Sequence, residues 1–568
     1  MRILLTTLHA KYAHASLALP CLAACCRDLP GVAVAIREYT VNEPREKLLR
    51  MIMSERAELV AFSCYIWNIS TTLQIVSDIK KIAPETLIVL GGPEVSFGAF
   101  ELMHDHPAVD FVIKGEGEAA FRQLVEVLAT QGAETLPGSA LEEIENLFFH
   151  DGDDISTGPH SRGYLQLDSI PSPFEAGLVD LNRPLTYYET SRGCPFSCAF
   201  CLSSVEGQVR SYSMERIRRD LLLLMQKQVP QIKLVDRTFN YDARRADAIW
   251  SFILEHNQGS HFHFEIAADL LSDASIDILH QVPDNTFRFE IGVQSASADT
   301  LKQVNRTADL GRIFYVIRRL RSETRVELHL DLVAGLPGED YTAFLASLQA
   351  VADLQPHQIQ VEPLKVLKGS PMREIARRED YRFSDSPPYT ILRNPWLSYD
   401  DIGRIETIGR LLDLFHNHAG FEHALRFMQQ RISMSALFDR MAREVTGESL
   451  FGRSTRRLYE LFAHLSHPLL PETERHQLYD VLFFDYCRSE MPLLGKLPAF
   501  IADRLQECAW PSRRDLPDGL DLPEGSRVKM FRFRFSKDYR GDVWHDGLVT
   551  VTFAYASIAG QGLRIVLM

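Results

Sequence analysis

Cys194, Cys198 and Cys201 fall within one stretch of eight residues, directly after a predicted strand at Thr186–Thr190. Thiolates are the ligands that hold iron–sulfur clusters in proteins. Parallel strands of an α/β barrel present their chemistry at their carboxyl ends, which is where this loop falls. The segment therefore predicts an iron–sulfur cluster with three protein ligands.

Three thiolates can bind three irons of a [4Fe-4S] cube and leave the fourth iron open. The amino and carboxylate groups of a methionine can chelate that iron. S-adenosylmethionine (SAM) contains such a methionine. An electron passed into the sulfonium would break its bond to the 5′ carbon and release a 5′-deoxyadenosyl radical. The predicted chemistry is reductive cleavage of SAM.

Two other metal or redox sites are consistent with cysteines at short spacing. A structural zinc site usually needs four ligands, and no second pair of cysteines lies nearby in the sequence. A thioredoxin-like Cys-x-x-Cys site would not need Cys194. The other cysteines are Cys21, Cys25, Cys26, Cys64, Cys487 and Cys508.

The pattern of apolar segments predicts an α/β protein of several domains. Five strand–helix repeats at the start predict a doubly wound, flavodoxin-like (Rossmann-type) domain, whose ligand lies beyond the carboxyl ends of its strands. Six further repeats predict a partial (β/α)6 barrel, and a mostly helical domain with terminal β-strands follows. The expected boundaries are 1–135 for the first domain, 136–182 for a linker with one small hairpin, 183–372 for the barrel and 373–568 for the C-terminal domain.

Bulk composition narrows the class of protein. The net charge of -14 over 568 residues argues against a nucleic-acid scaffold. Met1 leads straight into a strand-like stretch rather than a signal peptide, and no run reaches the roughly 18 apolar residues of a membrane span. Nine cysteines without an export signal do not suggest disulfides. We expect a cytoplasmic protein with no membrane or nucleic-acid partner.

The spacing Cys-x3-Cys-x-Phe-Cys resembles that of the radical SAM superfamily, whose fold is a partial barrel. The resemblance implies that Phe200 lies against the SAM adenine. It also implies SAM contacts from Glu265 on the third barrel strand, Gln294 on the fourth and Asp331 on the fifth. Asp236 follows the second strand, where many members carry Gly-Gly-Glu.

A doubly wound domain before this barrel resembles the cobalamin-dependent branch of the superfamily. The loops that follow its strands supply the candidate cobalamin-binding residues, although an Asp-x-His-x-x-Gly motif, which provides a histidine ligand to cobalt in other cobalamin proteins, is missing. The last third resembles the uncharacterised C-terminal domain of one subgroup. The candidate cobalamin contacts are His9, Tyr12, His14, Ser63, Gly91, Gly92 and Gly115.

The resemblance implies a methyltransferase that acts on an unactivated carbon or phosphorus centre. It would use a [4Fe-4S] cluster, SAM, cobalamin and a reductant such as flavodoxin or ferredoxin. One alternative is a cyclisation, ring rearrangement or oxidation without net methylation. A tRNA methylthiotransferase would need three further cluster cysteines in the first domain, and a non-catalytic redox sensor would not turn over SAM. The sequence does not indicate the substrate.

Overall fold

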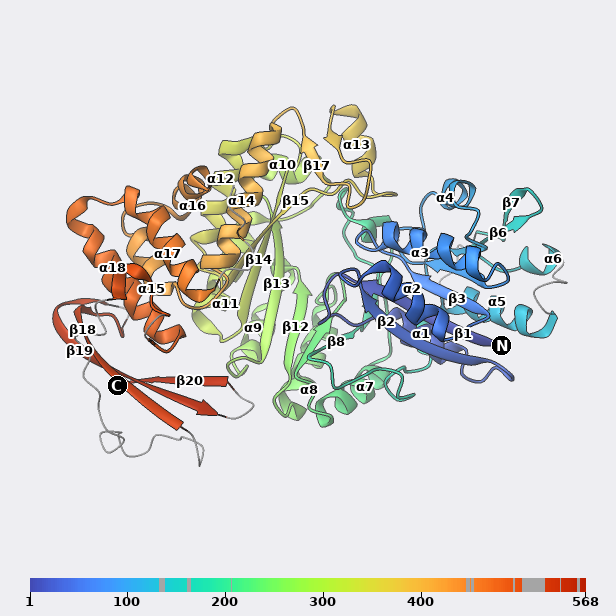
Figure 1. Ribbon diagram of the computed structural model, residues 1–568, viewed down its shortest axis with the longest axis horizontal. Helices are drawn as coiled ribbons and strands as arrows, with labels where there is room; N and C mark the ends of the chain where they lie inside the picture. Colours follow the sequence, from blue (N-terminus) through green and yellow to red (C-terminus); the bar gives the residue numbers. More distant parts are fainter. Residues whose placement is uncertain are drawn as a thin grey trace.

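The computed structural model places three lobes along its long axis, with the first domain at one end, the barrel in the middle and the C-terminal domain at the other end (Figure 1). The flavodoxin-like domain, the partial barrel and the helical C-terminal part predicted from the sequence are all confirmed. The described residues are 1–131, 138–160, 165–205, 207–445, 450, 454–493, 496–502, 527–541, 543–558 and 562–568.

The first domain is a seven-stranded sheet of order β2-β1-β3-β4-β5-β6-β7, in which β1 to β5 are parallel. Two separate apolar cores lie on its faces, one under α2, α3 and α4 and the other under α1 and α5. Covering on both faces explains why β1 is buried along almost its whole length. The elements are β1 Arg2–His9, α1 Ala18–Cys25, β2 Ala33–Thr40, α2 Arg45–Ser54, β3 Leu59–Ser63, α3 Ile69–Ile82, β4 Leu87–Gly91, α4 Ala99–Asp105, β5 Phe111–Ile113 and α5 Glu118–Gln131.

The segment expected to be a linker contributes to this first sheet. A hairpin of β6 (Leu147–Asp151) and β7 (Asp154–Thr157) pairs antiparallel with β5 and extends the sheet by two strands. Helix α6 (Gly138–Leu141) precedes the hairpin, and a short 3-10 helix at Leu167–Ser169 follows it. The connection between the domains therefore begins only after the hairpin.

The barrel sheet has six parallel strands in the order β15-β14-β13-β12-β11-β8. Along β13, residues alternate between fully buried apolar side chains under the helices and partly exposed polar ones on the concave face. The strands are β8 Leu185–Tyr188, β11 Gln231–Leu234, β12 His261–Ile266, β13 Phe287–Gln294, β14 Glu327–Ala334 and β15 Gln358–Pro363. The helices are α7 Met214–Gln226, α8 Ala243–His256, α9 Asp273–Leu279, α10 Ala298–Gln303, α11 Leu310–Glu323, α12 Tyr341–Ala352 and α13 Met372–Arg378.

Several short helices and strands lie at the mouth of this barrel. These are β9 Ser191–Arg192, η3 Leu202–Val205, β10 Arg210–Ser211, η4 Ala268–Leu270, β16 Arg382–Phe383 and β17 Ile391–Arg393.

The C-terminal domain covers the open edge of the barrel. Helix α14 begins with a capping box formed by Ser398 and Asp401. Asn417, just after α14, hydrogen-bonds both backbone groups of Ile359 on the edge strand β15, at 2.9 Å each. These bonds satisfy polar groups that an uncovered edge strand would leave unpaired. The helices are α14 Tyr399–Phe415, α15 Glu422–Gln429, α16 Met434–Glu444, α17 Thr455–Ser466, η5 His467–Leu469 and α18 Glu472–Ser489.

Three antiparallel strands form the last sheet, in the order β18-β19-β20. The alternating phenylalanines Phe531, Phe533 and Phe535 are buried, and the last two contact Phe483 of α18. The strands are β18 Arg527–Asp538, β19 His545–Ile558 and β20 Gly562–Leu567.

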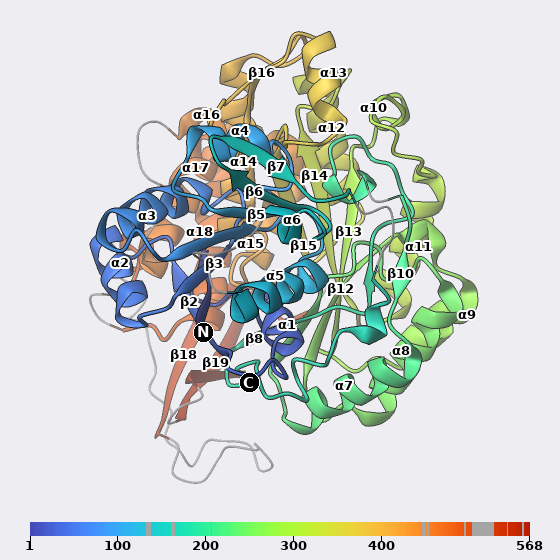
Figure 2. The same ribbon diagram turned by 90° about the vertical axis from the view of Figure 1, so that its right-hand side faces the viewer.

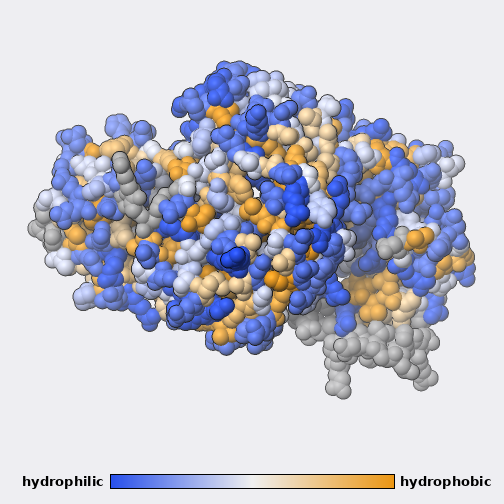
Figure 3. All heavy atoms as spheres, turned by 180° about the vertical axis from the view of Figure 1, so that it is seen from behind, coloured by the Kyte–Doolittle hydropathy of each residue, from blue (hydrophilic) through white to orange (hydrophobic). Residues whose placement is uncertain are grey.

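The surface seen from behind is mainly hydrophilic, with apolar residues scattered between the polar ones (Figure 3). None of the helices within the described ranges combines the length and the apolar character needed to cross a bilayer.

The barrel core depends on Trp250 of α8, which is fully buried against Phe239, Phe264 and Phe289. We predict that Trp250→Ala destabilises the protein by about 3–5 kcal/mol, because it removes a large buried side chain and leaves a cavity. Urea unfolding followed by circular dichroism measures the effect. The control Tyr399→Ala removes a ring that is 67% exposed and should change stability by less than about 0.5 kcal/mol. Equal effects of the two substitutions would contradict this assignment of the core.

Candidate active site

The cysteine loop is closed at its base by the β9–β10 ladder, in which Arg192 pairs with Arg210. Gly193 has φ +87, and a Cβ atom there would lie 2.1 Å from the Gln208 carbonyl oxygen. Only glycine fits this position without displacing backbone. Further along the loop, the Ala199 N–H donates to Val304 at 2.8 Å, and the Ala199 carbonyl accepts from Met372 at 2.8 Å. The loop is therefore fixed on both sides.

The three predicted cluster cysteines lie together in this loop. Burial raises the pKa of the Cys198 thiol, the neighbouring Cys201 and Cys194 thiolates add to the rise, and the Arg306 guanidinium opposes it. Arg306 lies 3.6 Å from the Cys198 sulfur, and the Thr238 hydroxyl lies 3.4 Å from the Cys194 sulfur. Spacing along the chain does not identify Arg306 or Thr238 as neighbours of the cysteines, because both come from other loops at the barrel mouth.

The spacing of the sulfurs fits a cluster better than a single ion. Zinc binds thiolates at about 2.3 Å, so three thiolates on one ion lie less than about 4.6 Å apart. Among the described residues, the groups whose ligand atoms all lie within 4.8 Å of one another do not include these cysteines. Ligands to separate irons of a cube can lie farther apart, so the donor set fits the predicted cluster.

Gln294 and Asp331 reach the concave face beside one another on β13 and β14. A β-bulge between Gly292 and Gln294 and a φ of +68 at Gln294 turn the end of β13. A Cβ atom at Gly292 would lie 2.1 Å from the Gln294 amide nitrogen, so glycine makes room for that side chain. Gln294 Oε1 and Asp331 Oδ1 are buried without a hydrogen-bond partner. Unpaired buried polar atoms are costly, so this pair fits a polar ligand such as SAM.

Glu265 and Phe200, the other predicted SAM contacts, lie on different parts of the barrel. Burial and the negative charge of Glu290 raise the pKa of Glu265, with Lys233 opposing at 3.8 Å. Phe200 is partly buried against the barrel core.

Asp236 stands where many superfamily members carry Gly-Gly-Glu, and it is completely buried. Its carboxylate accepts hydrogen bonds from the Thr190 N–H at 2.9 Å, from the Thr190 hydroxyl and from the Ser191 hydroxyl. The Arg245 guanidinium lies 3.8 Å away. Asp236 therefore fixes the strand that leads into the cysteine loop.

The glycines of the first domain lie at the carboxyl edge of its sheet. Gly92 has φ +102, and a Cβ atom there would lie 2.6 Å from the Cys64 carbonyl oxygen. The Ser96 hydroxyl donates to the Gly92 carbonyl and accepts from the Gly115 N–H, at 2.8 and 3.0 Å. A Cβ atom at Gly115 would meet nothing within 4 Å. Gly91, at the end of β4, lies next to these hydrogen-bonded residues at the same edge of the sheet.

The candidate residues on the first and third strands have different surroundings. His9 lies 3.2 Å from Glu38, and His14 bonds the Tyr187 hydroxyl of β8 through Nδ1 at 2.6 Å. Tyr12, between them, is 89% exposed. Ser63 is buried, and its carbonyl accepts from the Thr7 hydroxyl at 2.8 Å.

A pair of stacked aromatic rings stands at the same edge, just after β3. Tyr65 and Trp67 are nearly parallel, with ring centroids 4.4 Å apart, and Trp67 is 45% exposed. The indole N–H of Trp67 donates to the Leu8 carbonyl at 3.1 Å, which fixes the ring. Sequence reasoning marked this loop but not the aromatic pair, because its stacking depends on the loop conformation.

The first domain and the barrel lie side by side (Figure 1), and in the turned view the first domain is in front, with barrel helices α7, α8 and α9 to its right (Figure 2). Arg192, two residues before Cys194, lies 2.6 Å from Glu118 of the first domain and 2.7 Å from Glu189 of the barrel. Arg210 pairs with Glu116 in the same region. Candidate residues for two large cofactors thus face one another across one interface.

Gly193→Ala should prevent stable assembly of the cluster, because the added methyl group displaces the Gln208 carbonyl and the positive φ is strained by about 1–3 kcal/mol. Iron and sulfide analysis after anaerobic reconstitution measures the effect. Gly207→Ala is the matched control: φ is +64, but a Cβ atom meets nothing within 4 Å. Full cluster content in Gly193→Ala would contradict the proposed loop constraint.

Models of known protein families match three parts of the chain. A B12 binding domain matches residues 3–125, and the radical SAM superfamily matches residues 188–351. A family described as protein of unknown function (DUF4080) matches residues 379–509.

Curated relatives resemble part of the chain. The cobalamin-dependent radical SAM methyltransferase TokK of Streptomyces tokunonensis is 24% identical over 371 residues, which cover 62% of this chain and 53% of TokK. The hopanoid C-3 methylase of Methylococcus capsulatus is 28% identical over 287 residues, which cover 49% of this chain and 54% of that enzyme. The chain thus spans only about half the length of these relatives.

Solved structures share the fold at low sequence identity. TsrM from Kitasatospora setae, a radical S-adenosylmethionine methyltransferase with cobalamin and a [4Fe-4S] cluster bound, has a TM-score of 0.59 at 14% identity, over 85% of this chain and 98% of TsrM. The cobalamin-dependent radical enzyme OxsB has a TM-score of 0.56 at 14% identity, over 85% of this chain and 83% of OxsB. Along the chain, matches to a B12 binding domain, to the radical SAM superfamily and to a family of unknown function thus follow one another in this order.

Proposed function

We propose that this chain is a cobalamin-dependent radical SAM methyltransferase that acts on an unactivated carbon or phosphorus centre. The observation that carries the proposal is the meeting of the cysteine loop with the carboxyl edge of the first sheet, through Arg192 and Glu118. Transfer between two cofactors needs their reactive atoms held close together, and facing mouths supply that proximity. The names of the curated methyltransferase relatives support the same reaction class.

We assign Cys194, Cys198 and Cys201 as the cluster ligands. Arg306 directs a donor at the Cys198 sulfur, and the Thr238 hydroxyl lies beside the Cys194 sulfur. Hydrogen bonds and positive charge near cluster sulfurs stabilise the reduced form and raise the reduction potential. These two residues therefore tune how readily the cluster accepts an electron.

We assign the SAM site to the barrel mouth above the cysteine loop. The unpaired oxygens of Gln294 and Asp331 are acceptors for the ribose hydroxyls, and Glu265 is an acceptor deeper on β12. Phe200, held between the cluster ligands Cys198 and Cys201, places backbone and ring against the adenine.

We assign the cobalamin site to the carboxyl edge of the first sheet. Gly91, Gly92 and Gly115 allow close approach of the backbone, with Ser63 between the central strands. The exposed face of Trp67, backed by Tyr65, supplies a flat apolar surface for the corrin ring. The first loop, with His9, Tyr12 and His14, lines the same edge.

Bound at these sites, the cofactors supply a 5′-deoxyadenosyl radical and a transferable methyl group. The chain itself fixes their relative position through the ion pairs of Arg192 and through the His14–Tyr187 hydrogen bond. The electron that reduces the cluster would come from a reductant such as flavodoxin or ferredoxin in the cytoplasm.

Cys198→Ala should abolish formation of 5′-deoxyadenosine, because the cluster loses a ligand. The assay combines anaerobically reconstituted protein, cobalamin, SAM and reductant, and quantifies 5′-deoxyadenosine and S-adenosylhomocysteine. Cys26→Ala, a buried cysteine of the first domain, serves as the control and should behave like the parent protein. Unchanged 5′-deoxyadenosine in Cys198→Ala would reject the cluster assignment.

The same assay separates the reaction classes. Methyl transfer yields S-adenosylhomocysteine together with 5′-deoxyadenosine and a product heavier by a methyl group. Formation of 5′-deoxyadenosine alone would favour a rearrangement, cyclisation or oxidation without net methylation.

Trp67→Ala should weaken cobalamin binding by about tenfold, because the corrin loses an aromatic contact worth roughly 1.4 kcal/mol. Equilibrium dialysis with hydroxocobalamin measures the dissociation constant. Trp67→Phe keeps a flat ring and should retain most of the affinity. Parent-like affinity in Trp67→Ala would place the corrin elsewhere.

A further inference from the structure

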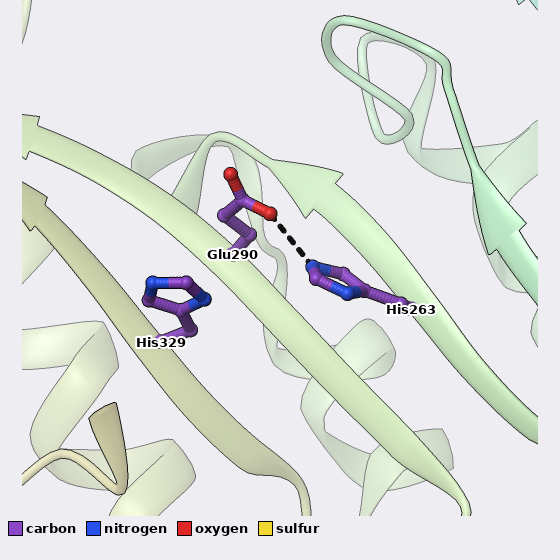
Figure 4. A group of neighbouring side chains, drawn as sticks. All are labelled: His263, Glu290 and His329. Carbon is purple, nitrogen blue, oxygen red and sulfur yellow. Dashed lines mark ion pairs between the residues drawn. The ribbon is translucent and has the colours of Figure 1, made fainter. Parts of the chain in front are cut away.

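The concave face of the barrel carries a group of polar side chains beside the predicted SAM contacts. His263 of β12, Glu290 of β13 and His329 of β14 converge from three neighbouring strands (Figure 4). In the sheet register, Glu290 pairs with His329 and with Glu265, whereas Asp331 lies at the level of Gly292, one step nearer the mouth. The group therefore lies deeper in the lumen than Asp331 and at the level of Glu265.

The geometry of this layer is that of a metal-binding site. Each side chain offers one ligand atom, and the three atoms all lie within 4.8 Å of one another. His263 Nε2 lies 2.8 Å from Glu290 Oε2. Two histidines and one carboxylate are a donor set that divalent zinc and iron accept.

One imidazole nitrogen of this group lacks a hydrogen-bond partner. The side chain of His329 is 12% exposed, and its Nδ1 is buried without a partner. The side chain of His263 is 8% exposed, and its Nε2 is 2.8 Å from the Glu290 carboxylate. A buried nitrogen such as His329 Nδ1 is costly unless a ligand satisfies it.

The protonation states of the side chains suit a cation. Burial lowers the pKa of His329 to about 4 and also lowers the pKa of His263. Although burial opposes it, contacts from His263 and Lys233 lower the pKa of Glu290, so this carboxylate is ionised. Metal ligands must be deprotonated in this way before they bind.

The neighbours of the three residues complete the arrangement. His329 Nε2 lies 3.3 Å from Asp331 Oδ1 without forming a hydrogen bond to it. Lys233 donates to Glu290 Oε2 at 2.9 Å, on the oxygen that His263 also approaches. Negative charge accumulates here, since Glu290 and Glu265 both raise the pKa of Asp331 beyond the effect of burial.

A second group of similar composition, Glu422, His423 and Asp485, lies in the C-terminal domain. There the Asp485 carboxylate is satisfied by His423 Nδ1 at 2.6 Å and by the Ala424 N–H at 2.8 Å, and Arg488 covers the imidazole. That group is an internally bonded cap at the start of α15. In the barrel group, by contrast, Nδ1 of His329 has no hydrogen-bond partner.

We propose that His263, Glu290 and His329 form a binding site for a divalent transition-metal ion such as zinc, separate from the iron–sulfur cluster. Three ligands from one face of the sheet leave the remaining coordination positions directed into the lumen. An ion there would bind an oxygen atom of a substrate as a Lewis acid. Metal binding itself does not rest on the proposed methyl transfer.

The test uses the full-length chain with Cys194, Cys198 and Cys201 replaced by alanine, so that no cluster forms. Titration with Co²⁺ alone should give one equivalent of ion with d–d absorption and without a thiolate charge-transfer band. Competition with a chromophoric chelator gives the affinity for Zn²⁺. His263→Ala and His329→Ala in this background should lower that affinity by about 100-fold or more, at least the loss typical of an orienting partner.

Matched variants keep the result interpretable. His261→Ala removes a neighbouring histidine of β12 outside the group and should leave Zn²⁺ affinity unchanged. Glu290→Gln conserves volume and should lose the ion while circular dichroism stays that of the parent. Absence of bound Co²⁺, a thiolate band, or parent-like affinity in His263→Ala and Glu290→Gln would overturn the proposal. These measurements do not depend on SAM cleavage. Their failure would therefore overturn the metal site without contradicting the proposed function.

Discussion

The position of Arg192 is the constraint on which the rest of the site depends. Its guanidinium lies between Glu118 of the first domain and Glu189 of the barrel, and Arg192 precedes Cys194 by two residues. Burial lowers the pKa of Arg192, but the two carboxylates outweigh it and raise that pKa well above its ordinary value. Loss of one partner from a buried ion pair leaves an uncompensated charge and costs about 3–5 kcal/mol. The same contact therefore fixes the cysteine loop and the domain interface.

Two sheets of the same chirality meet through this contact at their carboxyl ends. In parallel α/β sheets, ligands bind at those ends because loops there are free to vary while the strands remain packed. The bonded glycine edge of Gly92, Ser96 and Gly115 stands on one side, and the unpaired oxygens of Gln294 and Asp331 stand on the other. The C-terminal domain completes the barrel from outside, since Asn417 closes the edge strand β15. The first domain and the barrel thus each line one side of a shared site, and the C-terminal domain supports the barrel.

The sequence predicted the strands well, because buried parallel strands are apolar runs, and it placed the three cysteines in one loop because they are close together in the chain. It did not predict the contacts of Arg306 or Thr238 with the cysteines, since these join loops 108 and 44 residues apart. The β6–β7 hairpin was expected within a linker, but only its pairing with β5 reveals that it extends the sheet. The group of His263, Glu290 and His329 depends on strand register, which spacing along the chain does not give.

The central claim is that the cysteine loop and the first domain hold a [4Fe-4S] cluster and cobalamin face to face across the Arg192 interface. Electron paramagnetic resonance of the reduced chain loaded with both the cluster and Co(II) cobalamin tests it directly. The account predicts split or broadened signals, because the two unpaired spins would be close enough to couple. A spectrum equal to the sum of the two singly loaded samples would contradict it.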